Sequence, residues 1–432
     1  MPPSAQPTIA PDPRTQKGSS RLGGPFWRLF ASSSASNLSD GVLQAALPLL
    51  AATLTRDPLA VSALASLAFL PWLLFALPAG TLVDRINRRT AMAAANIGRG
   101  VLLAGMAVAV STGLASLPLL YVLAFLLGCA ETIYDSAARA MLPAVIDRSQ
   151  LERGNSLLTT AESVGNIFLG APIGAWLFAI AASIPLWGNA GAYLLAAGLI
   201  LIVAGRFRPE RARRTSVRAD MAEGLRWLAR HRLLRTLMVT VGAAALLQSM
   251  VNGIMVLFAL ENLGLSERGF GVLLAVAGVG AVIGSVLSPR LTRLLGRPRA
   301  MGLCDLVGSL ALAVMALVQL PAVGMIMFAV SAGTVSAFNV QIMSVRQAII
   351  PEALFGRVQG AYRTVIWGGI PLGTLAGGAL GGAFGLTTVF AVAGGAGAVV
   401  SLGTWWILHR HRAMIDAAFD TDPAPEADPV AH

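Results

Sequence analysis

The sequence predicts an all-α integral membrane protein, with twelve transmembrane helices arranged as two pseudo-symmetric six-helix bundles. Three observations predict this fold class: a composition with little charge, a regular series of apolar stretches, and basic residues confined almost entirely to one side of them. Of the 432 residues, 56% are hydrophobic and only 12% are charged, whereas soluble domains carry about 25% charged residues. The mean hydropathy of +0.71 excludes a chain of several soluble domains.

The apolar stretches give the helix count. A transmembrane helix needs about 20 apolar residues, and four stretches have the length of one helix while four have the length of two. Each long stretch has a break near its middle, at 112–118, 184–185, 320–321 or 384–385. The single helices are expected within 29–55, 58–83, 236–260 and 269–289, and the helix pairs within 90–130, 163–205, 300–345 and 364–408.

The basic residues test this count. With twelve helices, all but two of the 32 lysine and arginine residues lie towards the side that holds both termini; the exceptions are Arg56 and Arg268. An excess of basic residues marks the cytoplasmic side of a membrane protein. We therefore expect both termini in the cytoplasm and a multi-pass protein of the bacterial cytoplasmic membrane. The net charge of +11 then reflects topology, and a nucleic-acid partner is not expected.

The chain divides into five parts. The longest polar interval separates six expected helices from six, and Met221, Leu225 and Leu228 recur in it at the spacing of an amphipathic helix. No apolar segment precedes Phe26, so we expect no cleaved signal peptide. The expected parts are a disordered N-terminus (1–25), an N-terminal bundle (26–205), a cytoplasmic linker with an amphipathic helix (206–233), a C-terminal bundle (234–410) and a disordered acidic tail (411–432).

The two bundles echo each other in sequence. Gly170-Ala-Pro172-Ile-Gly174 in the fifth expected helix matches Gly369-Ile-Pro371-Leu-Gly373 in the eleventh, six helices later. Duplicated halves with a binding site near the bilayer midplane are a transporter architecture. The second of these motifs begins a stripe of glycines at every fourth residue up to Gly385, for which we expect packing within the protein rather than dimerisation.

A charged motif follows the second expected helix and reads Gly80-Thr-Leu-Val-Asp84-Arg85-Ile-Asn-Arg88-Arg89. It resembles the loop between helices 2 and 3 of the major facilitator superfamily. Asn37-x-x-Asp40 and Glu131-Thr-x-x-Asp135 resemble the exporter branch that includes enterobactin and macrolide exporters. The resemblance implies transport by alternating access. It also implies a latch at the cytoplasmic mouth, for which the candidates are Gly80, Asp84, Arg85, Arg88, Arg89 and Arg139.

Charged residues inside a membrane are costly and mark functional sites. Asp40 lies twelve residues past Arg28, about 18 Å along the helix, which places it close to the midplane. Glu131 has no basic neighbour on its own helix face, whereas Asp135 has Arg139 four residues later. We therefore expect proton coupling at Asp40, with Glu131 and Glu162 as further carriers. A polar seam between helices and a fixed ladder of salt bridges are the structural alternatives.

Polar residues on the faces of the expected helices predict the substrate cavity. Gln248 and Asn252, four residues apart, are the counterpart of the polar face around Asp40. Asp305 is expected to be a gate or packing partner, because it lies only a turn or two inside its helix. The expected cavity residues are Asn37, Gln44, Asp135, Asn166, Gln248, Asn252, Asn339, Arg363 and Trp367.

The chain has no phosphate-binding Gly-x-x-x-x-Gly-Lys loop, so an ion gradient is the expected energy source. We predict a secondary active exporter, coupled to protons, that moves amphipathic small molecules such as antibiotics, siderophores or other secondary metabolites. The alternative is a lysophospholipid flippase or a solute importer. No enzymatic activity, cofactor or metal site is expected, and the expected partners are the small-molecule substrate, protons and the lipid bilayer, with the protein as a monomer.

Overall fold

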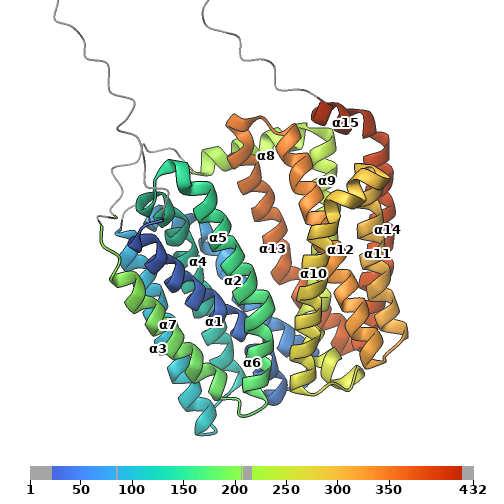
Figure 1. Cartoon of the computed structure of the whole chain (residues 1–432). Coiled ribbons are helices and arrows are strands. Elements are labelled where there is room, and N and C mark those ends of the chain that lie inside the picture. The colour runs from blue at the N-terminus through green and yellow to red at the C-terminus, as the bar shows by residue number, and fades with distance from the viewer. Residues whose placement is uncertain (1–21, 84–85, 206, 208–216, 421–432) are drawn as a thin grey trace, which may run out of the picture.

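The computed structural model describes residues 22–83, 86–205, 207 and 217–420, and this part of the chain is built from helices (Figure 1). Their order follows the expected series. The elements are α1 (Gly24–Leu54), α2 (Pro58–Val83), α3 (Arg88–Ser111), α4 (Leu117–Val145), η2 (Arg148–Gln150), α5 (Leu151–Ser163), η3 (Val164–Gly170), α6 (Ala171–Phe178), α7 (Ile184–Leu201), α8 (Val217–Arg230), α9 (Arg232–Leu257), η4 (Phe258–Asn262), α10 (Glu267–Leu295), α11 (Arg297–Leu317), α12 (Pro321–Ile349), α13 (Glu352–Phe384), α14 (Leu386–Arg410) and α15 (Arg412–Asp420).

These elements form the expected twelve long rods, because α5, η3 and α6 join end to end and η4 extends α9. We call α1–α7 the N-terminal half and α9–α14 the C-terminal half. Within the described residues, nine helices are long and apolar enough to cross a membrane by themselves. The other three rods are α1, with its row of serines, the interrupted α5–α6 rod, and the glycine-rich α13. The prediction of an all-α membrane fold is confirmed.

Helix packing repeats between the halves. In the N-terminal half the second rod packs on the fourth and the third on the sixth, as α2 on α4 and α3 on α7. In the C-terminal half α10 packs on α12 and α11 on α14, which are the same pairs six rods later. The halves meet through α2 with α13 and through α6 with α10. In each contact the second rod of one half packs against the fifth rod of the other half. The two contacts are therefore equivalent, as expected for a pseudo-symmetric arrangement.

The repeated glycine-proline motifs have matching roles in this packing. A methyl group added at Gly174 would overlap with the backbone of Val42 in α1, and one added at Gly373 would overlap with the backbone of Leu246 in α9. Each motif therefore brings its rod into backbone contact with the first rod of its own half. Gly377, one turn further along, makes the same close approach to Met250 of α9. Gly373 and Gly377 of the glycine stripe thus serve packing inside the chain.

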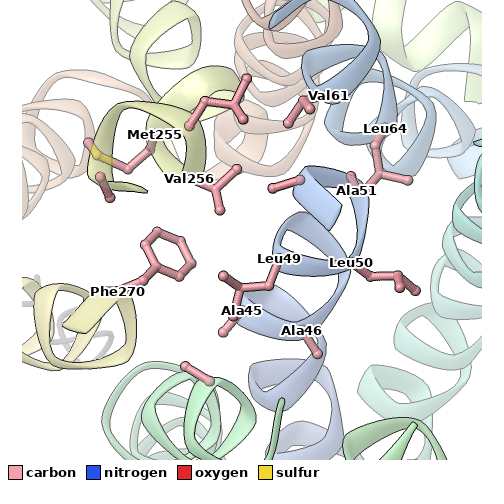
Figure 2. Close-up of a cluster of buried hydrophobic side chains, with 14 of the residues drawn as sticks. Ala45, Ala46, Leu49, Leu50, Ala51, Val61, Leu64, Met255, Val256 and Phe270 are labelled. Atoms are coloured by element: carbon pink, nitrogen blue, oxygen red, sulfur yellow. The ribbon is translucent and has the colours of Figure 1, made fainter. Parts of the chain in front are cut away.

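Buried apolar side chains show that the two halves share a core at one end only. The largest core includes residues from both halves, among them Leu49 and Leu64 of α1 and α2 and Val256 and Phe270 of α9 and α10 (Figure 2). Two smaller cores lie towards the other end, one made only of residues from the N-terminal half and one only of residues from α8 to α15. We call this second end the linker end, because α8 and α15 lie there (Figure 1).

The ends of the chain differ in part from expectation. We expected disorder from residue 411 onwards, but Arg412–Asp420 forms helix α15. The helix is held by apolar contact, since Ile415 is fully buried in the linker-end core of the C-terminal half. The interval expected to hold an amphipathic helix contains α8, whose Leu228 is buried while Leu225 is exposed. Residues 1–21 and 421–432 lie outside the described residues.

Candidate transport site

A buried arginine forms the centre of a polar cluster inside the N-terminal half. Arg99 of α3 is only 1% exposed, and its Nη1 lies 3.3 Å from Oδ1 of Asp40 in α1. The hydroxyl of Tyr193, from α7, donates a hydrogen bond to the same carboxylate oxygen. Two other helices, α3 and α7, therefore supply one ion pair and one hydrogen bond to Asp40 of α1. A carboxylate in a bilayer is stabilised by such partners.

Two aromatic rings and a second layer of polar groups enclose the guanidinium. It lies 5.4 Å from the ring centre of Tyr134 and 5.2 Å from that of Tyr193. Ser36 accepts a long hydrogen bond of 3.5 Å from Arg99 and donates to Asn96, which is fully buried. Nη2 of Arg99 and Nδ2 of Asn96 have no acceptor among the described residues. The cluster therefore has unused donor capacity next to the ion pair.

Further acids surround this cluster on α4 and α5. Glu131 interacts electrostatically with Asp40, Asp135 and Glu162 as well as with Arg99. The structure thus brings together the three expected proton carriers. Asp135 forms an ion pair of 3.5 Å with Arg139, as their spacing of four residues predicts. In the described part of the chain, the acids do not group closely enough with each other or with His and Cys for a metal site.

Other expected cavity residues of the N-terminal half lie beside a π-helical segment. A π-helical turn inside an α-helix frequently accompanies a functional site, and η3 follows directly after α5. Asn166 belongs to η3, and its side-chain oxygen is buried without a described donor. The backbone of Asn37 in α1 lies against Gly165 of η3. Gln44, two turns further along α1, is exposed.

A cavity of about 620 Å³ lies in the C-terminal half and is lined by α9, α11, α12, α13 and α14. Three of the expected cavity residues line it: Gln248, Asn339 and Trp367. Asn252 accepts a hydrogen bond from Gln248. The side chain of Arg363 lies outside the described residues. The sequence-predicted cavity residues therefore fall into two groups, one beside the charged cluster of the N-terminal half and one around this cavity.

The described arginines of the expected latch bond within their own half. Nη1 of Arg88 donates to the backbone oxygen of Ala140 at 2.8 Å, and Nη1 of Arg89 donates to that of Val203 at 2.9 Å. Both acceptors belong to the N-terminal half, whose core at the linker end is separate from that of the C-terminal half. Asp84, Arg85 and the side-chain environment of Gly80 lie outside the described residues.

The two basic residues on the opposite side from all others each contact the other half. Arg56, between α1 and α2, lies 3.6 Å from Glu261 of η4. Arg268 of α10 lies 5.8 Å from the ring centre of Trp176 in α6. These two arginines are thus the exceptions to the charge bias, and both make contacts between the halves at the end where the halves share a core.

Sequence reasoning identified Asp40 but missed its partners. The signal for Arg99 was present, since it is the lone charge within the apolar stretch 90–130. Tyr193 gave no comparable signal, because a tyrosine in an apolar helix usually belongs to the core. Its role depends on α7 packing against both α1 and α3.

Comparisons with known proteins agree with this architecture. A family model described as transmembrane secretion effector matches residues 23–427. An uncharacterized MFS-type transporter of Mycobacterium tuberculosis is 30% identical over 386 residues, which cover 79% of this chain and 81% of the relative. The multidrug efflux pump Tap of the same organism is 30% identical over 390 residues, which cover 86% of this chain and 90% of the pump. The solved nucleoside transporter NupG has the same fold, with a TM-score of 0.72 at 12% identity over 93% of this chain and 100% of that chain.

Proposed function

The chain belongs to the transmembrane secretion effector family of the major facilitator superfamily, and from this membership we propose that it is a proton-coupled exporter of amphipathic small molecules. The substrate moves from the linker end, which we assign to the cytoplasm, to the opposite end. The likeness to a multidrug efflux pump over most of both chains supports export of compounds of this class.

The observation that carries the proposal is the ion pair between Asp40 and Arg99 inside the N-terminal half. When Asp40 is ionised, the pair is neutral and holds α1 against α3. A proton on Asp40 removes the attraction and leaves the charge of Arg99 without its nearest partner. Glu131 then becomes the acid that balances the charge of Arg99, because Glu131, like Asp40, interacts electrostatically with this guanidinium. Proton binding thereby changes which helices the guanidinium holds together.

Coupling requires only that proton and substrate favour opposite states of the transporter. Asn37 and Gln44 extend the face of α1 on which Asp40 lies, and Asn166 lies on the neighbouring η3. A substrate bound at this face of α1 therefore opposes the change in helix contacts that protonation of Asp40 causes. We assign proton coupling to Asp40, with Glu131 as the second carrier and Glu162 as the group through which protons reach it.

The arrangement of the cores supports an inward-facing state. The halves share one core at the end away from α8 and have separate cores at the linker end. The outward-facing state requires the reverse, so the contacts of Arg56 and Arg268 must break during each cycle. In that state Asp84, Arg85, Arg88 and Arg89 close the cytoplasmic mouth, with Arg139 beside them.

Efflux from growing cells tests this function. Cells that overexpress the chain are loaded with ethidium, tetracycline, erythromycin or a catecholate siderophore, and efflux is followed with and without a protonophore. The control is the Asp416→Asn variant, which loses a pair with Arg412 inside α15 only. Protonophore-sensitive efflux of at least one compound supports the proposal. Energy-dependent accumulation instead of efflux would assign the chain to the importers.

A further inference from the structure

The cavity in the C-terminal half extends away from the surface where the two halves meet. That surface is formed mainly by α2 with α13 and by α6 with α10. The cavity also reaches Asp305 of α11 and Gly397 of α14, two helices that take no part in those contacts. Its lining residues on α13 extend from Gln359 to Ile370, a stretch of twelve residues that rises about 16 Å along the helix. Its volume is that of a site for a drug-sized molecule.

Asp305 gives the cavity a negative charge that the described protein leaves uncompensated. Its side chain is half-buried, and it lies about 12 Å inside α11 from Arg297. Ser401 of α14 lies near it, but the hydroxyl of Ser401 donates to the backbone oxygen of Gly397. No basic side chain in the described part of the chain forms an ion pair with Asp305. An intramembrane carboxylate without a cation is expensive to keep.

Arg346 gives the same cavity a positive charge, nearer to the linker end. It lies about 5 Å inside α12 from Ile349. Its guanidinium stacks over Tyr362 at 4.2 Å, and Nη1 donates to Oε1 of Gln359 at 2.8 Å. These neutral neighbours hold the side chain in place but do not balance its charge. Among the described residues, no acid forms an ion pair with Arg346.

We propose that this cavity binds an amphipathic zwitterion, whose cationic group pairs with Asp305 and whose anionic group pairs with Arg346. Two opposite charges at different depths of one cavity match a ligand that carries both. The cavity is also lined by apolar side chains, among them Leu312, Ile366 and Ala393, which suits an alkyl or aromatic body. The inference names the substrate class for the proposed exporter and so rests on that function, but binding can be measured without transport.

Cys304 provides a reporter inside the cavity. It lines the wall next to Asp305, and among the described residues its thiol and that of Cys129 are free. In the Cys129→Ala background, alkylation by N-ethylmaleimide therefore reports on Cys304 alone. The protein is placed in nanodiscs of phosphatidylglycerol, and the probes share an octyl chain: a sulfobetaine zwitterion, a trimethylammonium cation, a sulfate anion and a neutral glucoside.

The sulfobetaine should slow alkylation of Cys304 at lower concentration than the three other probes. Asp305→Asn should raise the half-protecting concentration of the sulfobetaine and of the cation about tenfold or more, because a charge-assisted contact is lost. Arg346→Gln should do the same for the sulfobetaine and the sulfate but not for the cation. Arg290→Gln, an exposed change on α10 away from the cavity, should alter none of these values.

Equal protection by all four probes, or protection that neither variant weakens, would overturn the proposal. The alkylation rate without probe checks that each variant keeps its fold, and Asp305→Glu should retain protection even if Asp305→Asn misfolds. Nanodiscs that contain phosphatidylcholine separate two sources of the zwitterion. Protection without any probe there identifies a bilayer lipid, whereas its absence identifies a ligand from the water phase. Because no pH gradient is applied, failure of this test leaves proton-coupled export standing.

Discussion

Removing the two cross-half contacts at the end opposite α8 should shift the conformational equilibrium towards the outward-facing state. Arg56 and Glu261 are 60% and 40% exposed, so their ion pair belongs to the weak surface class, about 0.5 kcal/mol. The contact of Arg268 with Trp176 is a cation–π interaction at an exposed site, about 0.8 kcal/mol. Together they favour closure of this end by about 1.3 kcal/mol, close to a tenfold change in the population ratio.

Spin-label distances measure that ratio. Labels at Ala181 and Gln319, which are exposed at this end on opposite halves, should give a short distance when the end is closed and a long one when it is open. Arg56→Ala should raise the ratio of long to short distances about twofold, Arg268→Ala about fourfold, and the double variant about tenfold. The control Arg412→Ala removes a pair within α15 and should change nothing. An unchanged ratio in the double variant would refute the gating role of these two arginines.

Three further predictions concern stability. Arg99→Met should lower the free energy of unfolding by about 3–5 kcal/mol, because Asp40 is left as a buried charge without its partner; chemical denaturation in detergent should show that Asp40→Asn restores part of this loss. Gly174→Ala should cost about 1–3 kcal/mol, because the added methyl group overlaps with the backbone of α1, whereas Gly191→Ala at an open position of α7 should cost nothing in the same assay. Burial lowers the pKa of His231 from 6.5, and its ring accepts a hydrogen bond from the first turn of α9. The unfolded chain therefore binds the proton more readily, and the contribution of His231 to stability is full above pH 6.5 and is lost as the pH falls towards the lowered pKa. Thermal unfolding should show a larger loss between pH 8 and pH 5 for the wild type than for His231→Asn, and equal losses would contradict the assignment.

The fold could be predicted from sequence because charge and length are local signals. The basic residues mark each turn at one side, and each break between paired helices contains its own proline or glycine. The tail from residue 411 was the exception. Its helix depends on Ile415 entering a core made by residues far away in the chain, which no local pattern reveals.

The candidate site was predictable in part for the same reason. Asp40 was visible as a lone acid in an apolar helix, but its partners Arg99 and Tyr193 come from two other helices whose rotation the sequence does not fix. Gln248, Asn339 and Trp367, which were expected in the substrate cavity, line the cavity of the C-terminal half, whereas Asp305 was expected to be a gate or packing partner. Its place in the cavity follows from how α11 packs against α12 and α14.

Proton-driven transport by Asp40→Asn proteoliposomes tests the account most directly. The compound with the strongest protonophore-sensitive efflux is added outside vesicles that are acid inside, and its uphill accumulation is followed for wild type and variant. Asn keeps the size of the side chain but carries no titratable proton, so folding should persist while uphill accumulation falls to the level of vesicles without a gradient. Wild-type accumulation by Asp40→Asn would contradict the central claim that the carboxylate paired with Arg99 couples protons to transport.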